Sequence, residues 1–187
     1  MSYHKENLKE KLSEIAWEIC KTESWQKVNM RLVAAKAGVS TTAFYRHFKS
    51  KADLKAELMR RGFQILNEGM QDLTSNFSSY GAHYIRFGLE YPHIYDLMYG
   101  NSDLDMALYP DLKALSDASF NGVVEGLKSF MPDEAENLVI IKAYNVWASV
   151  HGIVGILRRS KWQGKQSGNL EWIENNLEEY LTLTTFK

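Results

Sequence analysis

The chain has 187 residues, 45% of them hydrophobic and 24% charged, the composition of an ordinary globular protein with one large domain or two unequal ones. Its single cysteine, Cys20, excludes an internal disulfide and a cysteine metal cluster, and we expect it to be a buried core residue. The formal net charge of −1 divides into +6 over residues 1–61 and −7 over residues 62–187, which suggests that only the first part meets a polyanion.

Hydrophobic residues recur at three- and four-residue spacing and no stretch alternates with a period of two, so the sequence predicts an all-α protein. Asn29, Ser40 and Ser50 are of the types that cap helix N-termini, and Gly38 is of the type that ends a helix. The predicted helices cover residues 5–22, 29–38, 40–48, 50–74, 76–90, 93–99, 110–130, 134–160 and 169–184. In the fourth of these, Gly62 and Gly69 are either flexible points or sites of close packing.

The most informative stretch is NMRLVAAKAGVSTTAFYRHFKSKADL, residues 29–54. It places two short helices on either side of a tight turn at Gly38, which is the plan of a helix-turn-helix. Ala34 is small enough for a close helix crossing, and apolar residues of both helices supply the interior between them. The outward positions of the second short helix are hydrogen-bonding or basic: Thr41, Thr42, Tyr45, Arg46 and His47.

This run resembles the N-terminal domain of the tetracycline-repressor (TetR) family of transcriptional regulators, whose pattern is roughly T-x-x-x-I-A-x-x-A-G-V-S-x-x-x-x-Y-x-x-F-x-x-K-x-x-L. The residues in register with it are Val33 and Ala34, Ala37 to Ser40, Tyr45, Phe48, Lys51 and Leu54. Asn29 departs from the threonine usual in the family, and Leu32 stands where a polar residue is commoner. The resemblance predicts a three-helix DNA-binding domain over residues 1–61 and a larger helical regulatory and dimerisation domain over residues 62–187.

The resemblance also predicts how the first domain would contact DNA. Thr41 and Thr42 would lie near base edges, Tyr45 and His47 would contact phosphates, and Ser40 would begin the recognition helix. Lys51 would hold a phosphate together with the amides of its helix N-terminus. Asn29 and Arg31 would contact the flanking backbone, and Arg46 would either do the same or be a solvated surface charge.

In the second part of the chain, the segment Trp147–Gly152 and the run YPHIYDLMY, residues 91–99, resemble the regulatory domain named after its Trp-His-Gly signature. We expect an effector cavity among its large side chains, although any one of them is more often plain core. The candidates are Phe63, Tyr84, Phe87, Tyr91, Tyr95, Met98, Tyr99, Phe120, Met131, Trp147 and His151. His151 either binds the effector or is a core histidine bonded to a neighbour.

The helix predicted over residues 134–160 is apolar almost all round, so it needs covering on every face. We expect this helix and the last one to pair with their symmetry mates in a C2 homodimer. The interface residues predicted for that dimer are Tyr144, Val154, Leu157, Ile173, Leu177 and Leu181.

The sequence predicts no enzyme, metal or cofactor, since no metal-ligand spacing of histidines and no catalytic or nucleotide-binding motif is found. No apolar signal segment stands at the N-terminus, and Lys142, Asn145 and His151 interrupt the most apolar stretch, so a cytoplasmic protein is expected. The function predicted is a repressor that binds a palindromic operator as a homodimer and is released by a small apolar or aromatic effector. The alternatives are a DNA-binding regulator controlled by a protein partner, and a non-specific DNA-binding protein.

Overall fold

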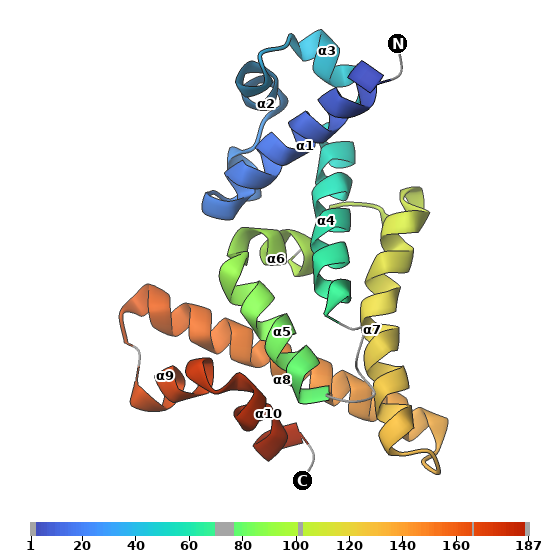
Figure 1. The fold of residues 1–187 in the computed structure, drawn as a ribbon, viewed down its shortest axis with the longest axis vertical. Coiled ribbons are helices and arrows are strands. Elements are labelled where there is room, and N and C mark those ends of the chain that lie inside the picture. The colour runs from blue at the N-terminus through green and yellow to red at the C-terminus, as the bar shows by residue number, and fades with distance from the viewer. Residues whose placement is uncertain (1–2, 70–76, 101–102, 166, 186–187) are drawn as a thin grey trace. The chain divides into compact units, whose positions relative to one another are not determined.

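The computed structural model describes residues 3–69, 77–100, 103–165 and 167–185, and over these all regular structure is helical (Figure 1). The predicted all-α class is therefore confirmed. The elements are α1 (Tyr3–Thr22), the 3-10 helix η1 (Trp25–Lys27), α2 (Met30–Ala37), α3 (Thr41–Tyr45), α4 (Lys51–Glu68), α5 (Phe77–Glu90), α6 (Pro92–Tyr99), the 3-10 helix η2 (Met106–Leu108), α7 (Pro110–Phe130), α8 (Glu136–Gln163), α9 (Gly168–Asn175) and α10 (Leu177–Thr185).

The chain folds into two compact units that do not follow a single cut in the sequence. We call residues 1–64 and 91–113 the N-terminal unit, and residues 65–90 and 114–187 the C-terminal unit. Residues 91–113, which contain α6 and η2, thus pack with the first helices of the chain. The helices α4 and α7 each run from one unit into the other, so both connect the units covalently.

The predicted helix caps form as expected. The side chain of Asn29 accepts a hydrogen bond from the backbone N–H of Leu32 at 2.8 Å, and Ser40 accepts one from Ala43 at 3.1 Å. Ser50 caps α4 in the same way, by accepting from the N–H of Asp53 at 3.1 Å. Gly38 ends α2 in the left-handed region, with φ +75°, a conformation that side chains with a Cβ rarely adopt. Local sequence therefore sets the starts of α2, α3 and α4 and the end of α2.

Three helix predictions need correction. The helix predicted over residues 50–74 ends at Glu68, and residues 70–74 lie outside the described part of the chain. The third helix ends at Tyr45 instead of Phe48, because the N–H groups of His47 and Phe48 both bond to the carbonyl of Phe44, in a tight turn. This turn places the Phe48 ring against Phe44, with the ring centroids 5.5 Å apart. The last predicted helix is divided at Asn176, whose side-chain amide donates to the carbonyl of Trp172 at 2.8 Å and so competes with the regular helical bonding.

The core of the N-terminal unit joins α1, α2, α3 and α4. Its fully buried side chains include those of Trp17, Phe44, Phe48, Leu54 and Phe63. Cys20 is buried here too, as predicted, and burial raises the pKa of its thiol to about 11, so the group stays protonated. The hydrophobic spacing of α1 and α2 thus gives a packed domain on which α3 is held.

In the C-terminal unit, α5 packs against both α8 and α10. One cluster of buried residues there comprises Phe77, Tyr80, Val123, Val124, Leu127, Val139 and Ala143, with contributions from α5, α7 and α8. By length and composition α8 is apolar enough to cross a membrane, but only part of it is buried within the chain. One face of α8 belongs to the core, and its other face carries exposed apolar residues.

Gly62 and Gly69 are sites of close packing, one of the two alternatives that the sequence left open. A Cβ added at Gly62 would collide with the side chain of Met98 on α6, and one added at Gly69 would collide with the ring of His83 on α5. Gly62 thus lets α6 approach α4 closely within the N-terminal unit, and Gly69, directly after α4, lets α5 approach closely within the C-terminal unit.

Candidate nucleic-acid interface

The helix α3 separates a buried side from an exposed, polar side. Phe44 is completely buried and packs edge-on against Tyr45, whose own side chain remains 47% exposed. Thr42 and Arg46 are exposed, and Thr41 and His47 are half-buried. The predicted base- and phosphate-contacting residues are therefore exposed or half-buried, either on α3 itself or, for Arg46 and His47, directly after it. This separation from the buried Phe44 is the arrangement that a recognition helix needs.

α2 holds α3 in place through small and apolar contacts. Val33, Ala34 and Ala37 are the buried residues of α2, and Ala34 at 1% exposure occupies the position where the sequence required a small side chain. The N–H of Val39 bonds to the carbonyl of Ala34 at 3.0 Å across the turn. The ammonium of Lys11 on α1 donates to the carbonyl of Ala37 at 3.0 Å, which satisfies a free carbonyl at the end of α2.

Lys51, the predicted phosphate ligand, is half-buried at the start of α4. Its ammonium lies 4.7 Å from the centre of the Trp25 ring and 3.4 Å from the Trp25 carbonyl oxygen. These contacts fix the orientation of the long side chain through a cation–π interaction. Trp25 was not among the residues predicted from the sequence, although an aromatic residue in the short link between α1 and α2 was the available signal.

Asn29 and Arg31 are both exposed at the N-terminus of α2. The side-chain oxygen of Asn29 caps the helix, which leaves its amide hydrogens as the donors suited to a phosphate. Leu32, which the motif did not explain, is exposed and lines a surface groove of about 570 Å³ with Ile15 and Ile19 of α1. No DNA-facing role is indicated for Leu32.

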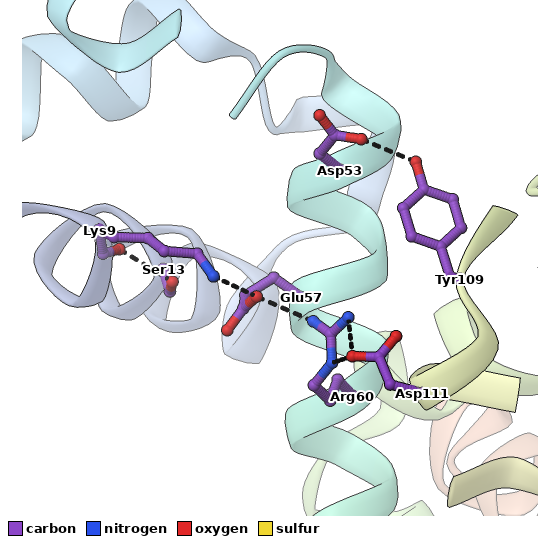
Figure 2. A network of polar contacts seen from close by, with 7 residues as sticks. All are labelled: Lys9, Ser13, Asp53, Glu57, Arg60, Tyr109 and Asp111. Carbon is purple, nitrogen blue, oxygen red and sulfur yellow. Dashed lines mark hydrogen bonds and ion pairs between the residues drawn. The ribbon is translucent and has the colours of Figure 1, made fainter. Parts of the chain in front are cut away.

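A chain of ion pairs ties α4 to α1 and to the start of α7, all within the N-terminal unit (Figure 2). The carboxylate of Glu57 lies 3.1 Å from the ammonium of Lys9 and 2.8 Å from the guanidinium of Arg60. Arg60 also contacts the carboxylate of Asp111 at 2.8 Å, as Figure 2 shows. The first turn of α7 is thereby attached to the helix that follows the recognition helix.

Near the N-terminus of α4 a second polar contact joins the same elements. The hydroxyl of Tyr109 donates to the carboxylate of Asp53 at 2.8 Å (Figure 2). Removal from water and this bond to Asp53 raise the pKa of Tyr109, so the phenol remains a donor at neutral pH. The contact holds α4 two residues beyond Lys51, although nothing in the sequence spacing pointed to this pairing.

The candidate effector residues divide between the two units. Phe63, Tyr91, Tyr95, Met98 and Tyr99 belong to the N-terminal unit, whereas Tyr84, Phe87, Phe120, Met131, Trp147 and His151 belong to the C-terminal unit. Only Tyr84 and Trp147 of these line a small enclosed cavity of about 20 Å³ in the C-terminal unit. Its other lining residues are Phe77, Tyr80, Gly81, Ser119, Val123, Val146 and Val150.

His151 is bonded to a neighbour within the C-terminal unit. Its Nε2 atom lies 2.9 Å from the hydroxyl oxygen of Tyr84, and its ring meets Trp147 edge-on with the centroids 4.4 Å apart. Burial lowers the pKa of His151 to about 4, so the ring is neutral at physiological pH. The cavity described above therefore has polar groups beside it, namely the neutral imidazole of His151, the hydroxyl of Tyr84 and the indole of Trp147.

The six predicted interface residues occupy different environments. Val154, Leu157, Leu177 and Leu181 are buried in the core of their own chain, Ile173 is half-buried, and Tyr144 is exposed. The exposed apolar face of α8 instead carries Ile141, Tyr144 and Ile156, with Gly152 and Gly155 between them. Among the described residues, a Cβ added at either glycine would meet no atom within 4 Å other than those of the chain neighbours and of the nearby backbone of α8 itself.

Among the residues that the structure describes, no group of three or more His, Cys, Asp or Glu residues is arranged to hold a metal ion.

Comparison with protein-family models gives two matches. Residues 14–58 match the model described as bacterial regulatory proteins of the tetR family, and residues 77–168 match the tetracyclin repressor-like C-terminal domain. Together the two models account for most of the chain, and their order follows that of the helix-turn-helix and the later helices. No protein of curated function matches the sequence.

Solved structures show the same fold over nearly the whole chain. A Rhodococcus protein of unknown function superposes with a TM-score of 0.75 at 21% identity, covering 95% of this chain and 91% of that one. The TetR-family regulator PfmR of Thermus thermophilus gives 0.65 at 15% identity, covering 94% and 98%. NalD of Pseudomonas aeruginosa, a secondary repressor of a multidrug efflux pump, gives 0.62 at 15% identity, covering 95% and 93%.

Proposed function

Because the chain belongs to the TetR family of DNA-binding transcriptional regulators, which are often repressors, we propose that it represses transcription as an effector-responsive homodimer on a palindromic operator. The observation that carries the proposal is the exposed polar side of α3, held on a buried core directly before the capped N-terminus of α4. Residues 1–61 would be the DNA-binding part, and the helices that follow would serve dimerisation and effector binding.

α3 would enter the major groove with Thr41 and Thr42 at base edges. Tyr45, His47 and Lys51 would contact phosphates, with Asn29 and Arg31 on the flanking backbone. The exposure of Thr42, Tyr45 and Arg31 supports these roles, as does the fixed orientation of Lys51 on Trp25. Arg46 is exposed as well and fits a phosphate contact or a solvated charge equally.

The dimer would form through the exposed face of α8. Ile141, Gly152 and Ile156 lie on one side of the helix, because they recur at spacings close to whole turns. The open space at Gly152 and Gly155 would let the same helix of a second subunit approach closely. Tyr144 and Ile173 of the predicted set would contribute directly, and Val154, Leu157, Leu177 and Leu181 would support the interface from the core. A C2 dimer presents two recognition helices about 34 Å apart, the spacing of successive major grooves.

A small neutral aromatic effector would bind in the cavity of the C-terminal unit. At about 20 Å³ the cavity admits about one water molecule, so such an effector enters only when a lining side chain such as Trp147 rotates. Ser119 lines the cavity, and its hydroxyl donates to the side chain of Asn67 at 2.6 Å, which in turn donates to the carbonyl of Leu115 at 2.9 Å.

Asn67 stands in the last turn of α4, whose first turn carries Lys51. An effector that engages Ser119 would therefore act directly on the helix that continues to the DNA contacts. The required shift between DNA-binding and released forms corresponds to a coupling of about 1–3 kcal/mol. A regulator that binds DNA would be cytoplasmic. The apolar character of α8 would then serve the core of the chain and the dimer interface.

Replacing Lys51 tests the proposed phosphate contact. We expect Lys51→Met to weaken binding about tenfold on every DNA sequence alike, and to reduce the slope of log affinity against log salt by about one, because one counterion fewer is released. Fluorescence anisotropy of labelled duplexes between 50 and 200 mM salt measures both quantities.

Lys49→Met is the matched control, because Lys49 is an exposed lysine two residues earlier to which no phosphate is assigned. Equal losses for the two variants, or a loss confined to one DNA sequence, would contradict the assignment of Lys51.

A further inference from the structure

Lys55 is a buried lysine that the proposed DNA contacts do not use. It lies on α4 one turn beyond Lys51, and only 8% of its side chain is exposed. A buried ammonium is costly unless a charged partner bonds to it. Within the described residues its ion-pair partner is Asp103, whose carboxylate oxygen lies 2.8 Å from the ammonium nitrogen.

Asp103 is an unusual partner for a buried charge. Its side chain is 94% exposed, and it stands between α6 and η2, outside any helix. The hydrogen bond from Lys55 lowers the pKa of Asp103, so this carboxyl group is ionised at neutral pH. A carboxylate that water surrounds on all other sides can be replaced by a second carboxylate, because little else holds it in place.

A pocket of about 170 Å³ lies beside Lys55 within the N-terminal unit. Its walls come from η1 and its cap, from α4 and from α6, namely Ser24, Trp25, Gln26, Lys55, His93, Asp96 and Leu97. Trp25 and Leu97 offer apolar surface, whereas Ser24, Gln26 and His93 offer hydrogen-bonding groups. This volume is smaller than that of pockets for drug-sized ligands, which have volumes of ~300 Å³ or more.

The charges around the pocket select among possible ligands. The ammonium of Lys55 favours a ligand with one negatively charged group. The carboxylate of Asp96, which also lines the pocket, disfavours a second negative charge on the ligand. The polar side chains of Ser24 and Gln26 suit a hydroxyl or amino group next to the carboxylate. We propose that this pocket binds a small monocarboxylic acid with an adjacent hydroxyl or amino group, whose carboxylate replaces that of Asp103 on Lys55.

The pocket shares the residue Trp25 with the contact that orients Lys51. A ligand packed against Trp25 would therefore affect the orientation of the Lys51 side chain, to which a DNA phosphate contact is assigned above. This consequence rests on the proposed function, whereas binding of the acid to Lys55 does not.

Titration of the full-length protein with L-lactate tests the site, with lactamide and sodium chloride as the matched uncharged and ionic probes. The indole N–H signal of Trp25 in a nitrogen-15 correlation spectrum, assigned with Trp25→Phe, reports binding. Asp103→Asn removes the built-in competitor, so we expect lactate to bind this variant about tenfold more tightly than it binds the unaltered protein. Lys55→Met should abolish the response.

The proposal is overturned if Asp103→Asn binds lactate no more tightly than the unaltered protein, or if lactamide or chloride shifts the Trp25 signal as lactate does. A lactate response that persists in Lys55→Met would overturn it equally. Asp103→Asn keeps a side-chain oxygen that can accept a hydrogen bond from the Lys55 ammonium, so we expect this variant to fold, which circular dichroism checks. The comparison of Asp103→Asn with the unaltered protein therefore remains decisive even if Lys55→Met does not fold.

Discussion

Gly152→Arg is expected to convert the protein from a dimer to a monomer and to weaken its binding to an inverted-repeat operator by at least about a hundredfold. The long cationic side chain would stand where the proposed interface needs an empty surface, next to Ile156. Loss of the second subunit removes the gain from simultaneous binding of two half-sites, which is about 10²- to 10⁴-fold. Sedimentation velocity and DNA binding measure the two effects.

The same substitution should leave the monomer folded, because arginine has a higher helix propensity than glycine and because no other described part of the chain stands within 4 Å of the added Cβ, outside the adjoining turns of α8. Asn121→Arg is a suitable control, since it adds the same charge at an exposed position of α7 in the same unit. A dimeric Gly152→Arg protein, or an Asn121→Arg protein that also dissociates, would place the interface elsewhere.

Phe44→Ala and Tyr45→Ala should separate stability from DNA recognition at neighbouring positions of α3. Phe44 is completely buried and packs against Phe48, so its truncation should cost about 3–5 kcal/mol of unfolding free energy. That is a large share of the roughly 5–15 kcal/mol typical of a whole domain. Urea unfolding followed by circular dichroism provides the measurement.

Tyr45 is half-exposed, so Tyr45→Ala should cost less than about 1 kcal/mol of stability, yet weaken operator binding about tenfold through a lost phosphate contact. Phe44→Ala is thus expected mainly to lower stability, whereas Tyr45→Ala is expected mainly to lower operator affinity. If Tyr45→Ala unfolds the protein or binds DNA normally, the proposed orientation of α3 is wrong.

The helix-turn-helix could be predicted from sequence in detail because its determinants are local. Asn29, Ser40 and Ser50 are caps whose partners stand three residues away, and Gly38 has the positive φ expected of it. The early end of α3 was missed, since it depends on the packing of Phe48 against Phe44 as well as on helix propensity. Tertiary contacts decided that boundary.

The later part of the chain was harder to predict, because its site residues are set by long-range contacts. The helical stripe of α8 identified apolar positions correctly but did not separate Val154 and Leu157, which face the core, from Ile141 and Ile156, which face outward. The contacts of Tyr109 with Asp53 and of Lys55 with Asp103 join residues about fifty positions apart. No spacing rule connects such pairs.

Selection of bound sequences from a random pool of duplex DNA, with the purified full-length protein at near-physiological salt, tests the central claim most directly. The proposed dimer predicts enrichment of an inverted repeat whose half-sites are centred about one helical turn apart. Enrichment of no sequence, with binding that disappears as salt is raised, would contradict a sequence-specific repressor and indicate a non-specific or partner-dependent DNA-binding protein.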